Sequence, residues 1–559
     1  MAWTSAAAAM KDASTMHPKP SVRLSHPLSA GEQEYIHKRK DVVLRTLNSL
    51  GITTTLDSVP HIALLASGGG QRAAVALMGS LHQMEQDGLL DTLLYLGGVS
   101  GSTWSMSLLY SDPWWSGNMG RAVSRLTSSE VGLEDALAWL GERMKKEDFS
   151  LTDIWAVITA GVIMKQLDFH LLSEESGRNA MNPYPIYSAI EKTCHQNGPT
   201  TAKWFEMTPH ESGFTELGLF INTSHLASQP HVPERQEMDM VKLQGVMGSV
   251  LADEQAMVNN FPDWLKAPQQ AKSVWDVLQL YTCMHHTVNK LMNVIRTNTD
   301  DPTSLSELDD VQKTLKENLN LLPFVTFQMM NPEERREMFD RWSQEMLKPL
   351  EAWIQIMEEG PYKEYVSRLT GSILHLIGRW EWGTTENFLY RYPNASVPFC
   401  LRSKQNLHLI DTGLHINMPF TPFLGHKRDI DLFIALEFSE GDIFKTLTLA
   451  KNYAAKVKKP FPEIDDKVLQ EKDWPKDFYV FEGKHNEPTI IYMPLFNRHN
   501  CKDAEEVRQR MEEYSTFQLP YSQEKIEFLL ETAKDNMKNN KDAILREVHK
   551  AAQRRQSNG

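Results

Sequence analysis

Cysteine is scarce in this chain, and long apolar runs are missing. The 559 residues include 4 cysteines, and no two of them lie at the short spacing that zinc sites and redox dithiols use. No stretch reaches the roughly 18 apolar residues of a membrane-spanning helix, and the start of the chain lacks the basic and apolar segments of a secretory signal. These absences predict a cytoplasmic protein of the reducing cytosol, with no structural metal site.

Basic residues are fewer than acidic ones, because the chain has 58 Lys and Arg and 72 Asp and Glu, which gives a formal net charge of −14. Nucleic-acid backbones reward clustered cations, so this balance argues against a general nucleic-acid partner. It also weakens attraction to anionic lipid. If the protein works at a membrane, attachment has to come from an apolar surface or a local basic patch.

Signals for covalent lipid anchors are missing at both ends of the sequence. Ala2 stands where myristoylation needs glycine, and residues 556–559 contain no cysteine for prenylation. We therefore expect any contact with intracellular membranes to be peripheral.

The organisation of the chain suggests one large catalytic unit with an insertion. Residues 1–30 show little periodicity and are typical of a disordered leader. Residues 31–555 are expected to form the catalytic domain, beginning with an amphipathic helix over residues 31–50. The less regular region at about 187–371 is assigned to a cap or lid.

Strand, turn and helix patterns follow one another twice near the start of this domain. Strands alternating with helices favour a mostly parallel sheet covered on both faces, which is a three-layer α/β fold. The first unit has a strand-like run at residues 61–66, a turn at 67–72 and a helix at 73–84, and the second unit has them at 92–98, 99–102 and 103–110. Further strands are expected at residues 407–410, 432–438, 478–481 and 489–493, and a final helix is expected at 522–552.

The second turn, Gly-Val-Ser-Gly-Ser at residues 98–102, places Ser100 between small residues. A nucleophilic serine needs such a sharp strand-to-helix turn, because larger neighbours would clash in the strained backbone. Ser100 is therefore the candidate nucleophile. An ordinary glycine-rich turn is the competing interpretation of the pentapeptide, and Ser102 is the competing serine.

The first turn, Ser-Gly-Gly-Gly at residues 67–70, presents consecutive backbone N–H groups at a predicted helix N-terminus. Partial positive charge gathers at such a terminus, so the loop suits a developing oxyanion. A cradle for nucleotide phosphate is the alternative. It is weakened because neither the phosphate-loop ending nor the dinucleotide fingerprint follows.

Four motifs together resemble the group IV cytosolic phospholipase A2 family, and the similarity spans most of the chain from about residue 31. The motifs are Ser-Gly-Gly-Gly-x-Arg at residues 67–72, Gly-Val-Ser-Gly-Ser-Thr-Trp at 98–104, Trp-Glu-Trp-Gly-Thr-Thr-Glu-Asn-Phe at 380–388 and Ile-Asp-Thr-Gly-Leu at 410–414. The layout is similar to the gamma form, a catalytic domain without a calcium-dependent lipid-binding module. The resemblance therefore implies a patatin-like fold and no calcium-driven recruitment.

The resemblance also implies the roles of individual residues. Ser100 would be the nucleophile and Asp411 its base, in a Ser/Asp dyad without a catalytic histidine. Gly69 and Gly70 would form the oxyanion hole, and Arg72 and Arg428 would bind substrate. Alone, Asp411 would be interpreted as a turn residue before Gly413.

The resemblance thus implies calcium-independent release of fatty acid from phospholipids at a membrane surface, and we expect no cofactor, no metal and no obligatory protein partner. Three alternatives remain open. The first is a Ser-His-Asp hydrolase, which would use a histidine that follows Asp411 in the chain. The second is a lysophospholipase or lysophospholipid acyltransferase, which would use the same Ser/Asp dyad. The third is an inactive lipid-binding protein, which would catalyse no reaction. The candidate histidines are His415, His426, His485 and His499.

Overall fold

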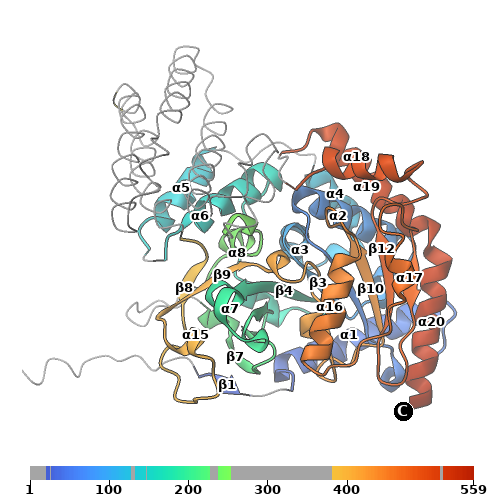
Figure 1. The fold of residues 1–559 in the computed structure, drawn as a ribbon, viewed down its shortest axis with the longest axis horizontal. Helices are drawn as coiled ribbons and strands as arrows, with labels where there is room; N and C mark the ends of the chain where they lie inside the picture. Colours follow the sequence, from blue (N-terminus) through green and yellow to red (C-terminus); the bar gives the residue numbers. More distant parts are fainter. Residues whose placement is uncertain are drawn as a thin grey trace, which may run out of the picture.

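A mixed sheet of 12 strands forms the centre of the protein in the computed structural model (Figure 1), which describes residues 21–24, 27–126, 133–146, 148–226, 237–252, 355, 381–516 and 520–558. The order is β1-β7-β6-β5-β4-β3-β2-β10-β12-β11, and β8 and β9 join beside β4. The bounds are β1 (Arg23–Leu24), β2 (Ile62–Ala66), β3 (Tyr95–Gly98), β4 (Tyr184–Glu191), β5 (Trp204–Met207), β6 (Glu211–Phe214), β7 (Leu219–Asn222), β8 (Thr384–Glu386), β9 (Asn406–Asp411), β10 (Leu432–Glu437), β11 (Tyr479–Phe481) and β12 (Thr489–Pro494).

The middle of the sheet is parallel, and its outer parts are antiparallel. Neighbouring strands from β4 through β3, β2 and β10 to β12 run in the same direction, whereas β11 and the β5–β7 meander run against their neighbours. Every residue of β2 and β10 is buried, as expected for parallel strands that carry helices on both faces. Helices flank the sheet on either side, which confirms the predicted three-layer α/β class (Figure 1).

The helices that follow the two motif turns pack together. The helix α2 (Gly70–Gln86) contacts α3 (Gly101–Tyr110) and α19 (Gln523–Asn539). Gly79 permits the close approach of α19, because a Cβ atom there would lie 2.5 Å from the Leu530 carbonyl oxygen. The long C-terminal segment therefore supports the helix that begins at the glycine loop.

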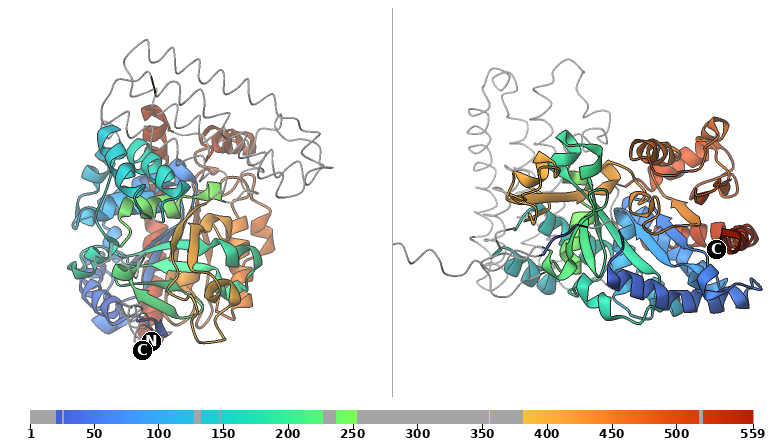
Figure 2. Two further views of the ribbon diagram at one scale, coloured as in Figure 1. Left: turned by 90° about the vertical axis from the view of Figure 1, so that its left-hand side faces the viewer. Right: turned by 90° about the horizontal axis from the view of Figure 1, so that it is seen from below.

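Other helices complete the layers. Ser29 caps α1, and the C-terminal helix α20 returns to the start of the domain, where Gln556 Nε2 donates to the Thr53 carbonyl oxygen at 2.9 Å (Figure 2). The remaining bounds are α1 (Ala30–Ser49), α4 (Met119–Arg125), α5 (Leu133–Arg143), α6 (Leu151–Val157), α7 (Lys192–Asn197), α8 (Met240–Met247), α15 (Phe399–Arg402), α16 (Lys445–Lys456), α17 (Asp466–Leu469), α18 (Ala504–Glu513) and α20 (Lys541–Asn558).

Three details differ from the sequence-based expectations. Residues 187–222, expected in the cap, contain most of β4 and all of β5, β6 and β7, and the rest of the expected cap lies largely outside the described residues. Within the expected leader, residues 23 and 24 pair with β7 as β1, and residues 1–20 lie outside the described part. The expected final helix is two helices that break at Asn540.

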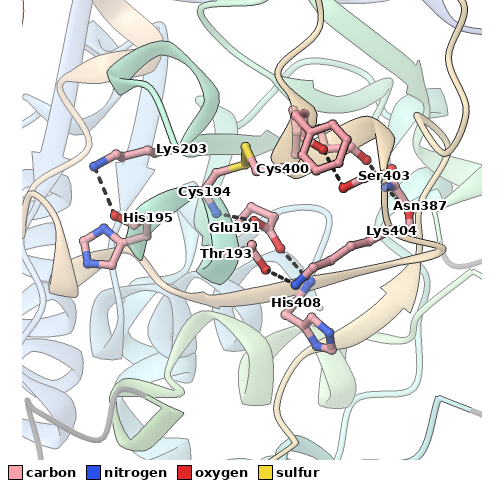
Figure 3. Close-up of a disulfide and its surroundings, with 12 residues drawn as sticks. Glu191, Thr193, Cys194, His195, Lys203, Asn387, Cys400, Ser403, Lys404 and His408 are labelled. Carbon is pink, nitrogen blue, oxygen red and sulfur yellow. Dashed lines mark hydrogen bonds between the residues drawn. A yellow bond between two sulfur atoms is a disulfide. The ribbon is translucent and has the colours of Figure 1, made fainter. Parts of the chain in front are cut away.

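A disulfide joins Cys194 of α7 to Cys400 of α15, with the Cα atoms 5.6 Å apart (Figure 3). The absence of short cysteine spacings did not predict it, because 206 residues separate the pair in sequence. The disulfide also departs from the expectation of reduced cysteines, since disulfides are rare in a reducing cytosol. Beside it, the Glu191 carboxylate accepts hydrogen bonds from the backbone N–H groups of Cys194 and His408, at 2.7 and 3.2 Å. The disulfide and Glu191 therefore both tie the end of β4 to the segment that leads into and forms β9.

No helix within the described residues is both long and apolar enough to cross a lipid bilayer.

Candidate active site

Ser100 lies at the sharp turn between β3 and α3. Its φ angle is 53°, a left-handed value that costs a residue other than glycine on the order of 1–3 kcal/mol. Ser100 is also the residue that precedes the first turn of α3, so its hydroxyl group lies at the positive end of that helix. The backbone is thus strained at the position where a nucleophile elbow requires it.

The glycine loop lies directly against this turn. Gly69 and Gly70 have φ angles of 155° and 57°, and Gly70 begins α2. A Cβ atom on Gly101 would lie only 1.9 Å from the Gly70 carbonyl oxygen, and one on Gly68 would lie 2.8 Å from Ser100 Cβ. The N-termini of α2 and α3 therefore converge around Ser100, and their partial positive charges favour an anion between them.

The N–H groups of Gly69 and Gly70 are available to such an anion. Within the described residues, neither group donates a hydrogen bond to another part of the chain. The neighbouring Gly68 N–H group, in contrast, is already used, since it donates to Asn417.

Strand register explains how Asp411 reaches Ser100 across 311 positions of sequence. Tyr187 of β4 pairs with both β3 and β5, whereas Ala189 pairs with both β5 and Asp411 of β9. Since β5 occupies one edge of β4 at both positions, β3 and β9 share the other edge. The two strands thus approach each other end to end, and Ser100, two residues beyond Gly98, comes level with Asp411. Sequence reasoning placed Asp411 on a parallel strand, but β9 is antiparallel to β4.

Asp411 is fully buried, and its surroundings suit a base. Burial raises its pKa to about 7, whereas interactions with the Ser100 hydroxyl group and the Gly413 N–H group act in the opposite direction. Oδ1 accepts from Gly413 N at 2.8 Å, and Oδ2 is buried without a hydrogen bond of normal geometry. Oδ2 is therefore the oxygen that can take the proton of Ser100 at neutral pH.

The rival serine has a structural partner instead. Ser102 is fully buried, and its hydroxyl group donates to the Ser67 carbonyl oxygen at 2.6 Å. This bond links the two motif turns. Ser102 therefore helps to hold the site together and does not face Asp411 in any described interaction.

Arg72 lies beneath the glycine loop with its side chain fully buried. Its Nε donates to the Phe438 carbonyl oxygen at 2.8 Å, Nη1 donates to the Tyr514 carbonyl oxygen, and the nearest carboxylate, that of Glu440, is 3.7 Å away. These partners leave the guanidinium group occupied by the protein. The arrangement supports an Arg72 that fixes the loop, and it does not expose Arg72 to a substrate phosphate.

Arg428 does not join the site. The Arg428 carbonyl oxygen contacts His61, which precedes β2. The glycine loop follows β2, whose five residues span about 17 Å, so Arg428 and the loop lie at opposite ends of this strand. The guanidinium group is buried between Glu32 and Glu206, at 2.8 and 3.0 Å. The structure therefore places Arg428 in an internal ion-pair cluster that joins α1 to β5.

The candidate histidines have other surroundings. The His415 ring packs against His195 and Tyr453, and burial lowers the pKa of His415 to about 4. His499 pairs with Asp477 at 3.3 Å, His485 is exposed, and His426 lines a surface pocket with Lys427. No described hydrogen bond joins any of the four to Ser100 or Asp411.

Metal ligation finds no support in the described residues, which contain no cluster of three or more His, Cys, Asp or Glu arranged to hold an ion. In the 380–388 motif, Trp382 and Phe388 belong to the hydrophobic core.

Sequence reasoning missed Asn417, whose side chain contacts the glycine loop. The one available signal was its position, as a polar residue between Ile416 and Met418 shortly after the Asp411 turn. A single amide in that setting has many structural explanations, so its partner could be identified only from the fold.

Known proteins are similar to this chain in fold and in sequence. Residues 62–128 match the family model described as the lysophospholipase catalytic domain. Cytosolic phospholipase A2 gamma of Homo sapiens is 30% identical over 548 residues, which cover 94% of this chain and 95% of the relative. The Mus musculus protein of the same name is 29% identical over 567 residues, which cover 94% and 92%.

A solved structure, human GIVD cytosolic phospholipase A2, superposes with a TM-score of 0.64 at 20% identity and covers 96% of this chain and 69% of that one. Fold and sequence similarity thus place this chain in the class of α/β carboxylic-ester hydrolases. Within that class, it belongs to the group IV cytosolic phospholipase A2 family.

Proposed function

We propose that this protein hydrolyses acyl esters of glycerophospholipids through a Ser100–Asp411 dyad and releases fatty acid and lysophospholipid. The observation that carries the proposal is the approach of the β3 and β9 ends, which sets Asp411 level with Ser100 on one edge of β4. The strained Ser100 backbone and the raised Asp411 pKa agree with it.

The first half of the reaction forms an acyl-enzyme. Asp411 Oδ2 takes the proton of the Ser100 hydroxyl group as Oγ attacks the ester carbonyl carbon. Negative charge develops on the carbonyl oxygen, where the N–H groups of Gly69 and Gly70 and the ends of α2 and α3 stabilise it. The bond to the glycerol oxygen then breaks, and protonated Asp411 returns a proton to that leaving alkoxide.

The second half regenerates the serine. Asp411 removes a proton from water, the hydroxide attacks the acyl carbonyl carbon, and Ser100 leaves with the proton that Asp411 now holds. The products are a free fatty acid and the original serine. No redox or metal-bound step is needed, and we propose calcium-independent turnover because all the invoked groups are side chains and backbone amides.

Covalent labelling tests the nucleophile directly. A GIVD cytosolic phospholipase A2 structure contains methyl gamma-linolenyl fluorophosphonate, so a fluorophosphonate lipid is a suitable probe. We expect one equivalent of phosphonate on the peptide that contains Ser100 and none on the Ser100→Ala variant. The Ser102→Ala variant is the matched control and should still be labelled. Stoichiometric labelling of Ser100→Ala at another serine would overturn the assignment.

A second candidate activity uses the same dyad. The matched family model is described as a lysophospholipase catalytic domain, and the acyl-enzyme can pass its acyl group to water or to a lysophospholipid. Lysophospholipase and acyltransferase activities are therefore proposed alternatives. Mass spectrometry of the products from a lysophospholipid with a labelled chain separates them, since hydrolysis yields labelled fatty acid and transfer yields labelled diacyl phospholipid.

The place of action follows from the substrate. Two of the similar proteins are named as cytosolic, and a phospholipid substrate resides in a membrane. We therefore propose a cytoplasmic enzyme that meets intracellular membranes peripherally, without a nucleic-acid or an obligatory protein partner.

A further inference from the structure

The side chain of Asn417 lies between the glycine loop and the turn that carries Asp411. Asn417 follows Asp411 by six residues, after the short 3₁₀ helix Thr412–Leu414, and it is partly buried. Its amide group contacts three separate segments of the site. None of the functional roles assigned above includes this residue.

Hydrogen bonds connect Asn417 to both sides of Gly68. The Gly68 N–H group donates to Asn417 Oδ1 at 3.1 Å and is also 3.2 Å from the Asn417 backbone carbonyl oxygen. In return, Asn417 Nδ2 donates to the Gly68 carbonyl oxygen at 3.2 Å. One side-chain amide therefore satisfies the donor and the acceptor of the residue that precedes the proposed oxyanion hole.

The same amide group reaches two other parts of the site. Nδ2 also donates to Ser439 Oγ at 2.7 Å, just beyond the end of β10. A Cβ atom on Gly413 would lie 2.7 Å from Asn417 Oδ1 and 3.1 Å from Asp411 Oδ1, so the amide oxygen lies against the Asp411 turn. On the other side, a Cβ atom on Gly68 would lie 2.3 Å from Asn417 Oδ1.

We infer that Asn417 is a positioning residue, which fixes the glycine loop relative to Ser100 and Asp411 by bonding Gly68 through both ends of its amide. The inference rests on the proposed dyad mechanism and adds a residue to it. Asn417 does not touch the reacting atoms. It acts through Gly68, since a shift of Gly68 moves the N–H groups of Gly69 and Gly70 away from the developing oxyanion.

The chemistry of the amide explains why asparagine is required. The group must accept one hydrogen bond and donate two, whereas an ionised carboxylate only accepts and a leucine side chain does neither. Asn417→Asp keeps the size of the side chain but loses both donated bonds, and Asn417→Leu loses all three. Misplacing catalytic groups by about 1 Å can cost about 100-fold in rate.

The test compares Asn417→Asp and Asn417→Leu with wild type for kcat, KM, fluorophosphonate labelling rate and thermal midpoint. Asn497→Asp is the matched control, because Asn497 is a fully buried amide that donates to the carbonyl oxygens of Pro494 and Leu495 and has no contact with the dyad. We expect both Asn417 variants to lose about 100-fold in kcat and in labelling rate, with KM changed less than threefold. Asn497→Asp should lose thermal stability to a similar degree and keep its kcat.

Two outcomes would overturn the inference. If the Asn417 variants keep wild-type kcat, or lose no more kcat than Asn497→Asp at the same loss of stability, Asn417 has only a structural role. Ser100→Ala is measured in the same series to separate this failure from a failure of the proposed function. Turnover that survives Ser100→Ala overturns the dyad and this inference together, whereas a dead Ser100→Ala beside an active Asn417→Asp overturns the inference alone.

Discussion

Among the residues of the proposed dyad, Asp411 is the one whose chemistry the fold changes most clearly. An aspartate in water has a pKa of about 3.9 and is a weak base. Here the end of β9 carries the carboxyl group into the interior, where burial raises its pKa to about 7. Asp411 is thus ionised when the pH is above about 7, and it can still hold a proton during turnover near neutrality.

We expect kcat/KM to rise with pH and to level off above about 7, because the proposed mechanism needs ionised Asp411 and burial raises the pKa of its carboxyl group to about 7. A pH series from 5 to 9 with a neutral, soluble ester substrate checks this without altering a membrane surface. A profile that stays flat down to pH 5 would show that the essential base has an ordinary carboxyl pKa.

The same pKa change predicts an effect on stability. Because the pKa of Asp411 is higher in the folded state than in the unfolded state, folded protein loses stability as the pH rises from about 4 through about 7. Asp411→Asn removes this buried charge, so the variant should be inactive and more stable than wild type at pH 8 by roughly 2–4 kcal/mol. The difference should shrink toward pH 4. Unfolding by denaturant at both pH values measures it, and equal stabilities at pH 8 would contradict the burial argument.

Gly101 tests the contact between the two turns. Because a Cβ atom there would lie 1.9 Å from the Gly70 carbonyl oxygen, Gly101→Ala has to push α2 away from Ser100. We expect at least about a 100-fold loss of kcat/KM. Gly117→Ala is the control, since nothing lies within 4 Å of a Cβ atom at that position. Comparable activity in both variants would mean that the site tolerates separation of the turns.

Among the strands, β9 is the critical one, because it carries Asp411 and yet pairs with β4 over only three positions, in the antiparallel direction. Two features strengthen this pairing, namely the Glu191 hydrogen bond to His408 and the Cys194–Cys400 disulfide. Both act near the end of β4. The position of Asp411 therefore depends on contacts that lie some distance along the strand from the dyad.

The disulfide gives a prediction at this scale. Removing a disulfide that closes a long loop typically costs 2–4 kcal/mol. In a protein of this size, that cost corresponds to a thermal midpoint about 2–3 °C lower in Cys400→Ser than in oxidised wild type. A dithiol reductant should lower the thermal midpoint of wild type by the same amount and leave the thermal midpoint of Cys400→Ser unchanged. If the reductant destabilises both proteins equally, the effect does not come from this bond.

Much of the element order could be predicted from the sequence, because continuous apolar runs and glycine turns are local signals. The strand predicted at residues 61–66, observed as β2, and the turns at Ser100 and Gly69 were identified in this way. Two features could not be predicted from the sequence, namely the antiparallel direction of β9 and the pairing of Cys194 with Cys400. Each depends on contacts between segments some 200 residues apart, and neither leaves a local pattern.

The failure at Arg428 has a similar cause. The family resemblance implied a substrate-binding role for Arg428, but the fold surrounds the residue with Glu32 and Glu206. Although burial opposes the charged form, Arg428 and Lys427 lower the pKa of Glu206 to about 2, so the cluster stays ionised at physiological pH. Such a partner set becomes visible only when α1 and β5 are brought together.

At the scale of the whole molecule, the net charge of −14 opposes binding to anionic membranes. Raising the ionic strength from about 0.01 to 0.15 M shortens the screening length from about 30 to 8 Å. We therefore expect the fraction of protein that sediments with anionic vesicles to increase as the ionic strength rises, while the fraction bound to zwitterionic vesicles changes little. A decrease with salt would show that a local basic surface outweighs the net charge.

The most direct test of the account measures fatty-acid release from mixed phospholipid vesicles, with and without a calcium chelator, for wild type, Ser100→Ala and Asp411→Asn. We expect wild-type release that the chelator does not change, and loss of release in both variants. Normal turnover by Asp411→Asn, or release that survives Ser100→Ala, would contradict it.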